Sequence, residues 1–172
     1  MAPLPPASTL WSLPDESINQ ILSVLFEPSP SLRSVLLPLI RHDTSITTYT
    51  DLANLARKTL LSLRATDPVL LEILSAHPRL GAKKVDSAQS QAEQRSLGGE
   101  EEHEKLARLN EEYEERFPGL RYVVFVNGRS REDIMEDMRR RIESGTQEGE
   151  VRAASEAMCD IAIDRAAKLG QK

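Results

Sequence analysis

Apolar residues recur at every third or fourth position through most of the chain, and this spacing predicts a succession of amphipathic helices. Residues 14–16, a proline followed by two acids, suit the first turn of a helix that continues to Phe26. Thr50 is a plausible N-cap for a second helix over residues 51–63. The same reasoning predicts helices over residues 31–40, 67–77, 87–97, 100–117, 130–145 and 147–169.

Residues 122–126 do not follow the helical pattern, because all of them are β-branched or aromatic. They lie between Pro118-Gly119 and Asn127-Gly128, both of which are typical of turns. We therefore expect a buried extended stretch without a strand partner. The backbone groups of this stretch and of the Asn127-Gly128 turn could bind a polar ligand, or the turn could be only a turn.

These elements together predict an all-α fold, a single-domain helical bundle of about eight helices with one short extended segment. At 172 residues and 40% hydrophobic composition, the chain has enough apolar side chains for one core, so we expect one domain over residues 1–172. The proline-rich start favours fraying of about the first ten residues, 1–10.

Composition narrows the classes of function. The formal charge of -5, with basic and acidic residues interleaved, argues against nucleic-acid binding. The single cysteine, Cys159, excludes an intramolecular disulfide and the cysteine clusters of structural zinc sites. Without a membrane-spanning run or a signal-peptide pattern, we expect a soluble intracellular protein, in the cytoplasm or in the peroxisome, although the chain does not end in Ser-Lys-Leu.

His77 is the first candidate for chemistry, because it lies where a predicted helix ends before Pro78. An imidazole of ordinary pKa changes charge near neutral pH, which suits a general acid or base. The structural alternative is a histidine that only bonds backbone carbonyls at the helix end. His42 lies in a predicted polar loop and His103 on an acidic helix face. No two histidines have metal-ligand spacing, so we expect no metal.

Ser90, Glu93 and Gln94 form a second candidate group, because their i, i+3 and i+4 spacing places them on one side of a helix. In the functional interpretation, Glu93 transfers a proton while Ser90 and Gln94 donate or accept hydrogen bonds. Two structural alternatives remain: an ordinary exposed face, or a capping box in which Ser90 begins the helix.

Arg165 is the third candidate, because it shares the apolar face of the last predicted helix. A guanidinium in such a row must find an anion or extend to the surface. Asp160 and Asp164 are nearby partners for a structural ion pair. If Arg165 instead lines a pocket, its fork of N–H donors fits a carboxylate or ureido oxygen.

At these residues the sequence resembles the 2-oxo-4-hydroxy-4-carboxy-5-ureidoimidazoline (OHCU) decarboxylases of urate degradation. The resemblance covers most of the chain. The most specific part is His77-Pro78-Arg79-Leu80-Gly81 followed by Ser90 and Glu93-Gln94. Further similar segments are Leu25-Phe26-Glu27-Pro28-Ser29-Pro30, Tyr113-Glu114-Glu115-Arg116-Phe117-Pro118, residues 122–129, Arg141-Ile142-Glu143, and the tail with Glu150, Ala154, Glu156, Ile161-Ala162 and Arg165.

The resemblance implies a homodimeric, all-α enzyme that needs neither metal nor organic cofactor and acts on a small molecule. Its catalytic residues would be His77, Glu93 and Arg165. Pro78, Ser90 and Gln94 match the positions that shape the family's pocket. The backbone of Val124, Phe125 and Val126 would contact the ureido or ring amides of the substrate.

The reaction implied is loss of CO2 from the ureidoimidazoline to give (S)-allantoin. An adjacent imine or carbonyl of the ring can accept the electron pair, so the enzyme must supply electrostatic stabilisation and one directed proton. Two alternatives stay open. A helical protein-binding module would present an exposed apolar groove, and a related acid–base enzyme on another ureido acid would differ only in its pocket walls.

Overall fold

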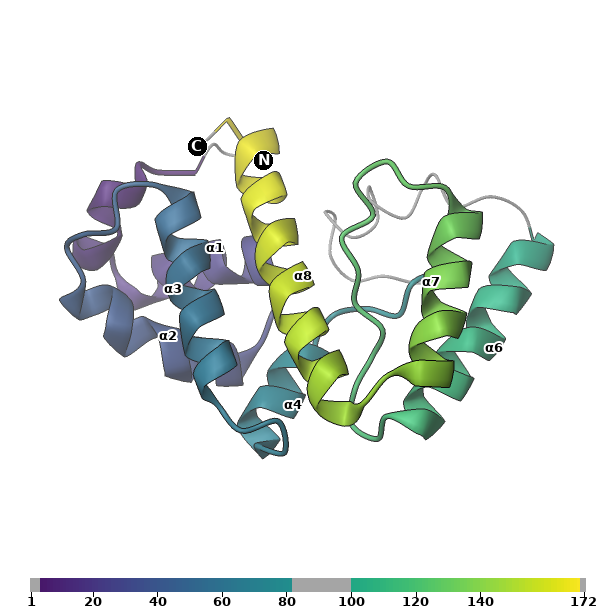
Figure 1. Cartoon of the computed structure of the whole chain (residues 1–172). Helices are drawn as coiled ribbons and strands as arrows, with labels where there is room; N and C mark the ends of the chain where they lie inside the picture. The colour runs from purple at the N-terminus through teal and green to yellow at the C-terminus, as the bar shows by residue number, and fades with distance from the viewer. Residues whose placement is uncertain (1–3, 82–99, 171–172) are drawn as a thin grey trace.

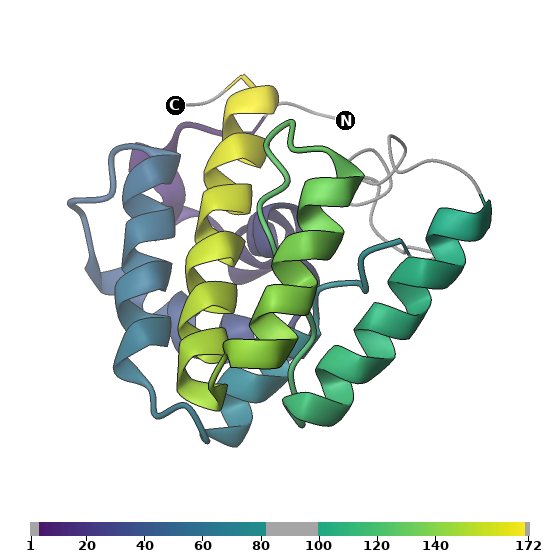
Figure 2. The ribbon, with the colours of Figure 1, turned by 45° about the vertical axis from the view of Figure 1, so that its right-hand side comes forward.

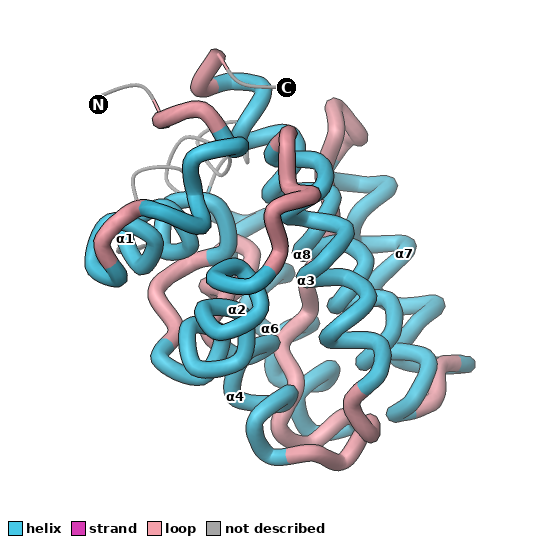
Figure 3. Tube along the Cα trace, turned by 90° about the vertical axis from the view of Figure 1, so that its left-hand side faces the viewer, coloured by secondary structure: helices cyan, strands magenta, loops and turns pink. Residues whose placement is uncertain are grey.

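The computed structural model describes residues 4–81 and 100–170, and this part of the chain contains helices and loops without a strand, as Figure 3 shows. The prediction of an all-α fold is therefore confirmed. The helices in chain order are η1 (a 3-10 helix, Ala7–Ser12), α1 (Asp15–Phe26), α2 (Pro30–His42), α3 (Tyr49–Ser62), α4 (Pro68–Ser75), α6 (Glu100–Arg116), α7 (Arg131–Ser144) and α8 (Gln147–Lys168).

Helix α8 runs through the middle of the molecule, with α1, α2 and α3 on one side and α6 and α7 on the other (Figure 1). It packs against α1, α3 and α4, while α6 packs against α7. Figure 2 shows α3 and α8 lying alongside one another. Because α8 is covered on several sides, buried residues occur around much of its circumference, among them Val151, Ala154, Met158 and Ile161.

Side-chain caps explain several of the helix starts. Thr48, and not Thr50 as the sequence suggested, caps α3: its hydroxyl accepts the Asp51 amide at 3.1 Å. The Asp51 carboxylate in turn accepts the Thr48 amide at 2.8 Å, which completes a capping box that Thr50 could not form. Ser130 and Asp133 form a second capping box at the start of α7, as the sequence indicated for that helix.

Of the ten residues expected to fray, the structure describes residues 4–10, and these are packed. Leu4, Ala7 and Leu10 are buried in the core. The Tyr49 hydroxyl donates a hydrogen bond to the Pro5 carbonyl at 2.9 Å, which ties this segment to α3. The prolines limit the backbone freedom of the segment, and its apolar side chains have a surface to cover, so residues 4–10 pack against the body of the protein.

The extended segment predicted over residues 122–126 is present and forms no strand. It follows α6 and the turn at Pro118-Gly119, and it leads to α7 through Asn127 and Gly128. Both turn residues have positive φ, 43° and 74°, and the Arg129 amide donates to the Val126 carbonyl at 2.9 Å. This is the geometry that an Asn-Gly pair favours, so the turn sets where the extended segment ends.

Candidate active site

The loop that follows α4 carries His77 and is fixed to α6 by side-chain contacts. The Arg79 guanidinium donates to both carboxylate oxygens of Glu114, at 2.7 and 2.6 Å. The Asn110 amide donates to the Leu80 carbonyl at 3.0 Å. Gly81 ends this run with a φ of 78°, a conformation that glycine adopts without strain. The loop is therefore held in one place although it has no regular secondary structure.

His77 is buried, with 5% of its surface exposed. Its carbonyl accepts a hydrogen bond from Arg121 at 3.0 Å, but neither ring nitrogen has a hydrogen-bond partner among the described residues. Burial, followed by the positive charge of Arg165, lowers the pKa of His77 from 6.5 to about 4, while the Glu27 carboxylate acts in the opposite direction. At neutral pH the ring is therefore uncharged and can accept or donate one proton.

Arg165 lies on α8 and is 2% exposed. Its Nη2 is 2.7 Å from Oε1 of Glu27, which is itself 3% exposed. Its Nη1 donates to the carbonyls of Val24 and Leu25, both at 3.3 Å. The guanidinium therefore lies against the C-terminal end of α1, where carbonyl groups give the helix a negative end.

The partners of Arg165 differ from those the sequence offered. Asp160 binds Arg57 at 2.6 Å, and Asp164 binds Lys168 at 2.6 Å, so neither of the two acids on α8 is the ion-pair partner of Arg165. The proposed ion pair with Asp160 or Asp164 is wrong because Asp160 binds Arg57 of α3 and Asp164 binds Lys168 of α8. Among the described residues, Arg165 forms its ion pair with Glu27, which lies 138 residues away in the sequence.

Glu27 is the residue of this cluster that sequence reasoning missed as a site residue. It follows the last turn of α1 with φ 77° and ψ 154°, a backbone conformation that side chains other than glycine rarely adopt. The available signal was a carboxylate directly after the apolar Leu25-Phe26 and before Pro28, where a solvated acid would be out of place. The pairing partner could not be read from that pattern.

The extended segment follows Arg121, whose side chain binds the His77 carbonyl. Val124, Phe125 and Val126 are half-buried. The carbonyls of Phe125 and Val126 accept hydrogen bonds from Arg129, at 2.6 Å from its side chain and 2.9 Å from its amide. The backbone of Val124 has no hydrogen bond to any residue in the described part of the chain.

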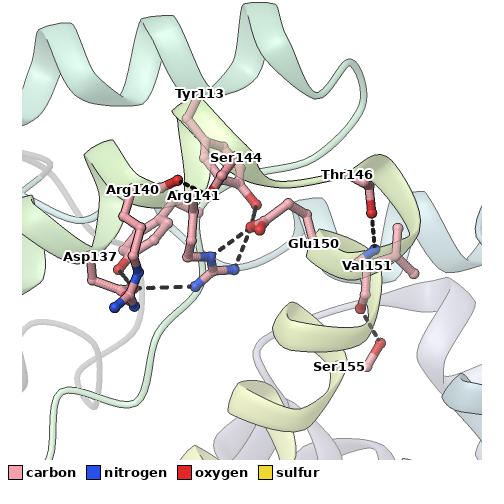
Figure 4. Close-up of polar contacts among 11 residues, drawn as sticks. Tyr113, Asp137, Arg140, Arg141, Ser144, Thr146, Glu150, Val151 and Ser155 are labelled. Carbon is pink, nitrogen blue, oxygen red and sulfur yellow. Dashed lines mark hydrogen bonds and ion pairs between the residues drawn. The ribbon is translucent and has the colours of Figure 1, made fainter.

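A buried polar network holds this segment in place (Figure 4). Glu150 of α8 accepts hydrogen bonds from Tyr113 at 2.7 Å and from Arg141 at 2.7 Å. The Arg141 guanidinium lies 4.7 Å from the centre of the Tyr122 ring, and the Tyr122 hydroxyl donates to Asp137 at 2.6 Å. Burial, together with the hydrogen bond to Asp137, raises the pKa of Tyr122, so its hydroxyl remains a donor. The network thus joins α6, α7, α8 and the extended segment.

The structure describes one of the four remaining predicted site residues. Pro78 is half-buried next to His77. Ser90, Glu93 and Gln94 lie outside the described residues, so their roles stay predictions.

Over residues 4–81 and 100–170 there is no group of three or more His, Cys, Asp or Glu side chains that could hold a metal ion. No described helix is both long and apolar enough to cross a bilayer.

A separate open hollow of about 460 Å³ lies between α1 and α2. Asn19, Ser23 and Arg33 contribute polar groups to it, and Leu37 contributes apolar surface. It does not include His77 or Arg165. The hollow is therefore distinct from the cluster that carries acid–base groups.

The fold defines a helical protein in which His77, Arg165 and Glu27 lie buried in one cluster. Comparison with known proteins gives the family. The family model of OHCU decarboxylase matches residues 11–167, so the chain belongs to the OHCU decarboxylase family. The resemblance inferred from the sequence is confirmed, and with it membership of a family of decarboxylases.

Two individual proteins are similar to the chain. The uric acid degradation bifunctional protein PucL of Bacillus subtilis (strain 168) is 35% identical over 101 residues, which are 56% of this chain and 20% of PucL. The chain thus spans about a fifth of the length of this relative. A crystal structure of (S)-allantoin synthase matches with a TM-score of 0.68 and 23% identity, covering 96% of this chain and 54% of that one, and this likeness shows the fold.

Proposed function

We propose that this protein decarboxylates 2-oxo-4-hydroxy-4-carboxy-5-ureidoimidazoline to (S)-allantoin in urate degradation. Membership of the OHCU decarboxylase family supports the reaction, and the names of the two similar proteins agree with this pathway. The observation that carries the proposal is the uncharged, buried His77, whose ring nitrogens lack partners among the described residues, beside the cation of Arg165.

The chemistry requires little from the protein beyond charge placement and one proton. The bond between the ring carbon and the carboxylate breaks, CO2 leaves, and the electron pair is taken up by the adjacent imine or carbonyl of the ring. The hydroxyl on the decarboxylated carbon then loses its proton as that carbon becomes a carbonyl. A proton adds to the neighbouring ring carbon, which carries the ureido group, from one face, and this gives one enantiomer of allantoin. Stabilisation of the developing negative charge by fixed donors and a fixed cation lowers the barrier.

In this mechanism Arg165, with Gln94, orients the ring and offsets its developing charge. His77 and Glu93 orient the hydroxyl and carboxylate of the substrate and transfer the proton. Because the pKa of His77 is lowered to about 4, the ring enters the reaction uncharged and is suited to accept the hydroxyl proton. The backbone of Val124 to Val126 binds the ureido or ring amides, and Pro78 and Ser90 shape the pocket. The protein acts as a homodimer on a small molecule.

The test follows the optical activity of allantoin while the substrate is generated in situ from urate by the upstream enzymes. With this protein present, the product is expected to be (S)-allantoin, because spontaneous decay of the substrate gives a racemate. His77→Asn and Arg165→Lys should each lower kcat/KM by at least about 100-fold, the range of a lost acid–base or charge-stabilising group. A racemic product formed at the spontaneous rate would refute the proposal.

A second measurement separates this function from a protein-binding module. Allantoin should raise the melting temperature saturably, because a ligand that binds only the folded protein stabilises it. The Arg165→Lys variant serves as the control and should show a smaller shift. The absence of a shift at high ligand concentration would favour the module.

A further inference from the structure

The backbone of Glu27 is strained, because its φ of 77° and ψ of 154° fall in a region that suits glycine. The side chain is also buried, at 3% exposure. A buried carboxylate on a strained backbone position persists only when surrounding contacts determine it. Among the described residues, the contact of this carboxylate is with Arg165.

The geometry around Arg165 explains what the carboxylate does. Oε1 of Glu27 is 2.7 Å from Nη2, while the carbonyls of Val24 and Leu25 accept from Nη1 at 3.3 Å. All three acceptors belong to the last turn of α1 or to the residue after it. These contacts hold the guanidinium from the side of α1. Among them, the Glu27 carboxylate is the charged acceptor, and the other two are neutral carbonyls.

We propose that Glu27 is a positioning residue of this active site, which fixes the Arg165 guanidinium against the end of α1 and partly offsets its charge beside His77. The inference rests on the proposed function in that the site is the same. It goes beyond that function by adding a residue from the first helix. It also accounts for a carboxylate at a backbone position where glycine would fit more easily.

The charges around His77 give the proposal a readout that does not depend on turnover. Among the described residues, the charged groups that face His77 are Arg165 from α8, Glu27 from the end of α1, and Arg121, which binds the His77 carbonyl. Arg165 lowers the pKa of His77 and Glu27 raises it. Removal of the Glu27 charge alone must therefore move the titration of His77 to lower pH.

The experiment is an NMR titration of the histidine rings in the wild type and in Glu27→Gln. The protein has three histidines, so His42 and His103 act as internal references. In Glu27→Gln, His77 should titrate at lower pH than in the wild type, while His42 and His103 are unmoved. kcat/KM for the proposed reaction should fall at least tenfold, and Glu27→Asp should restore part of both properties.

Two further variants separate positioning from general stability. Glu27→Gly removes the carboxylate but suits the backbone, so it should fold and still lose activity. Glu150→Gln removes the buried carboxylate of a second Arg–Glu pair, with Arg141, and should lower the melting temperature without moving the His77 titration. If Glu27→Gln is too unstable to titrate, Glu27→Gly gives the same titration test.

A folded Glu27→Gln or Glu27→Gly protein with an unmoved His77 titration and undiminished kcat/KM would overturn the proposal. The titration can succeed when the decarboxylase assay fails on the wild type. In that case the proposed function is wrong, while the role of Glu27 in fixing Arg165 beside His77 still holds.

Discussion

At the scale of single residues, the central feature is a balance of charge among His77, Arg165 and Glu27. An uncompensated guanidinium at 2% exposure would be costly, and the Glu27 carboxylate provides the compensation. The remaining influence of Arg165, together with burial, keeps His77 uncharged. The cluster thus presents a fixed cation and a neutral acid–base group side by side.

The lowered pKa of His77 predicts a pH dependence of stability. The folded protein binds this proton less tightly than the unfolded chain, whose histidine has an ordinary pKa of 6.5. This pKa difference therefore contributes fully to the free energy of unfolding above pH 6.5, and the contribution is lost as the pH falls towards about 4. It amounts to roughly 3 kcal/mol at most.

Urea unfolding of the wild type and of His77→Asn between pH 7 and pH 4 measures this contribution as the difference between the two curves. The variant should lose stability less steeply on acidification. Parallel curves would show that His77 is not held uncharged in the folded state.

The sequence predicted that Arg165 lies on the apolar face of the last helix, but it did not identify the residue that binds its guanidinium. Its place in an apolar helical row required either an anion or extension of the side chain to the surface. Only the fold could show that the nearby Asp160 and Asp164 bind other cations and that the end of α1 supplies Glu27. A contact between segments so distant in the chain depends on how helices pack, which local patterns do not encode.

At the scale of elements, the sequence predicted helices and their caps well where side chains act locally. The Ser130 cap is present as predicted. The segment over residues 122–126 is non-helical as predicted, but only Tyr122 and Val123 are buried, and residues 124–126 are half-buried. The N-cap of α3 was misplaced by two residues, because Thr48 and Thr50 are both suitable hydroxyl residues and only Thr48 has Asp51 at the spacing of a capping box.

The Asn127-Gly128 turn gives a prediction at this scale. Gly128 has a φ of 74° with nothing within 4 Å of an added Cβ, so Gly128→Ala meets only backbone strain, about 1 kcal/mol. Because the turn ends the extended segment proposed to bind substrate, the variant should also raise KM several-fold.

Gly170→Ala is the matched control, since Gly170 has a φ of 80° and equally open surroundings at the end of α8. It should lower the melting temperature by a similar amount and leave KM unchanged. An equal effect of both variants on KM would show that the turn has no specific role in substrate binding.

At the scale of the whole molecule, α8 connects the two sides seen in Figure 1. Near its start, Glu150 joins the network with α6 and α7, and near its end, Arg165 holds the end of α1. Its middle packs against α3, with Met158 fully buried. Loss of α8 packing would therefore affect both sides together, which predicts cooperative unfolding.

Met158→Ala should cost about 2–5 kcal/mol, the range for a large buried side chain replaced by alanine. Trp11, the single tryptophan, reports on the side of η1 and α2, whereas Tyr113 and Tyr122 contribute to near-ultraviolet circular dichroism from the other side. Both signals should shift to the same new midpoint. Val69→Ala, at a position that is 38% exposed, should barely move either signal, and separate midpoints would show that the two sides unfold independently.

The position of Cys159 within α8 has a practical consequence. This single thiol is buried, and burial raises its pKa to about 12, so a thiol-specific reagent meets almost no thiolate while the protein is folded. Cysteines introduced at the surface can therefore be labelled selectively with fluorophores or spin labels in the otherwise natural chain. The labelling rate of Cys159 itself would then measure how often the molecule opens around its central helix, α8.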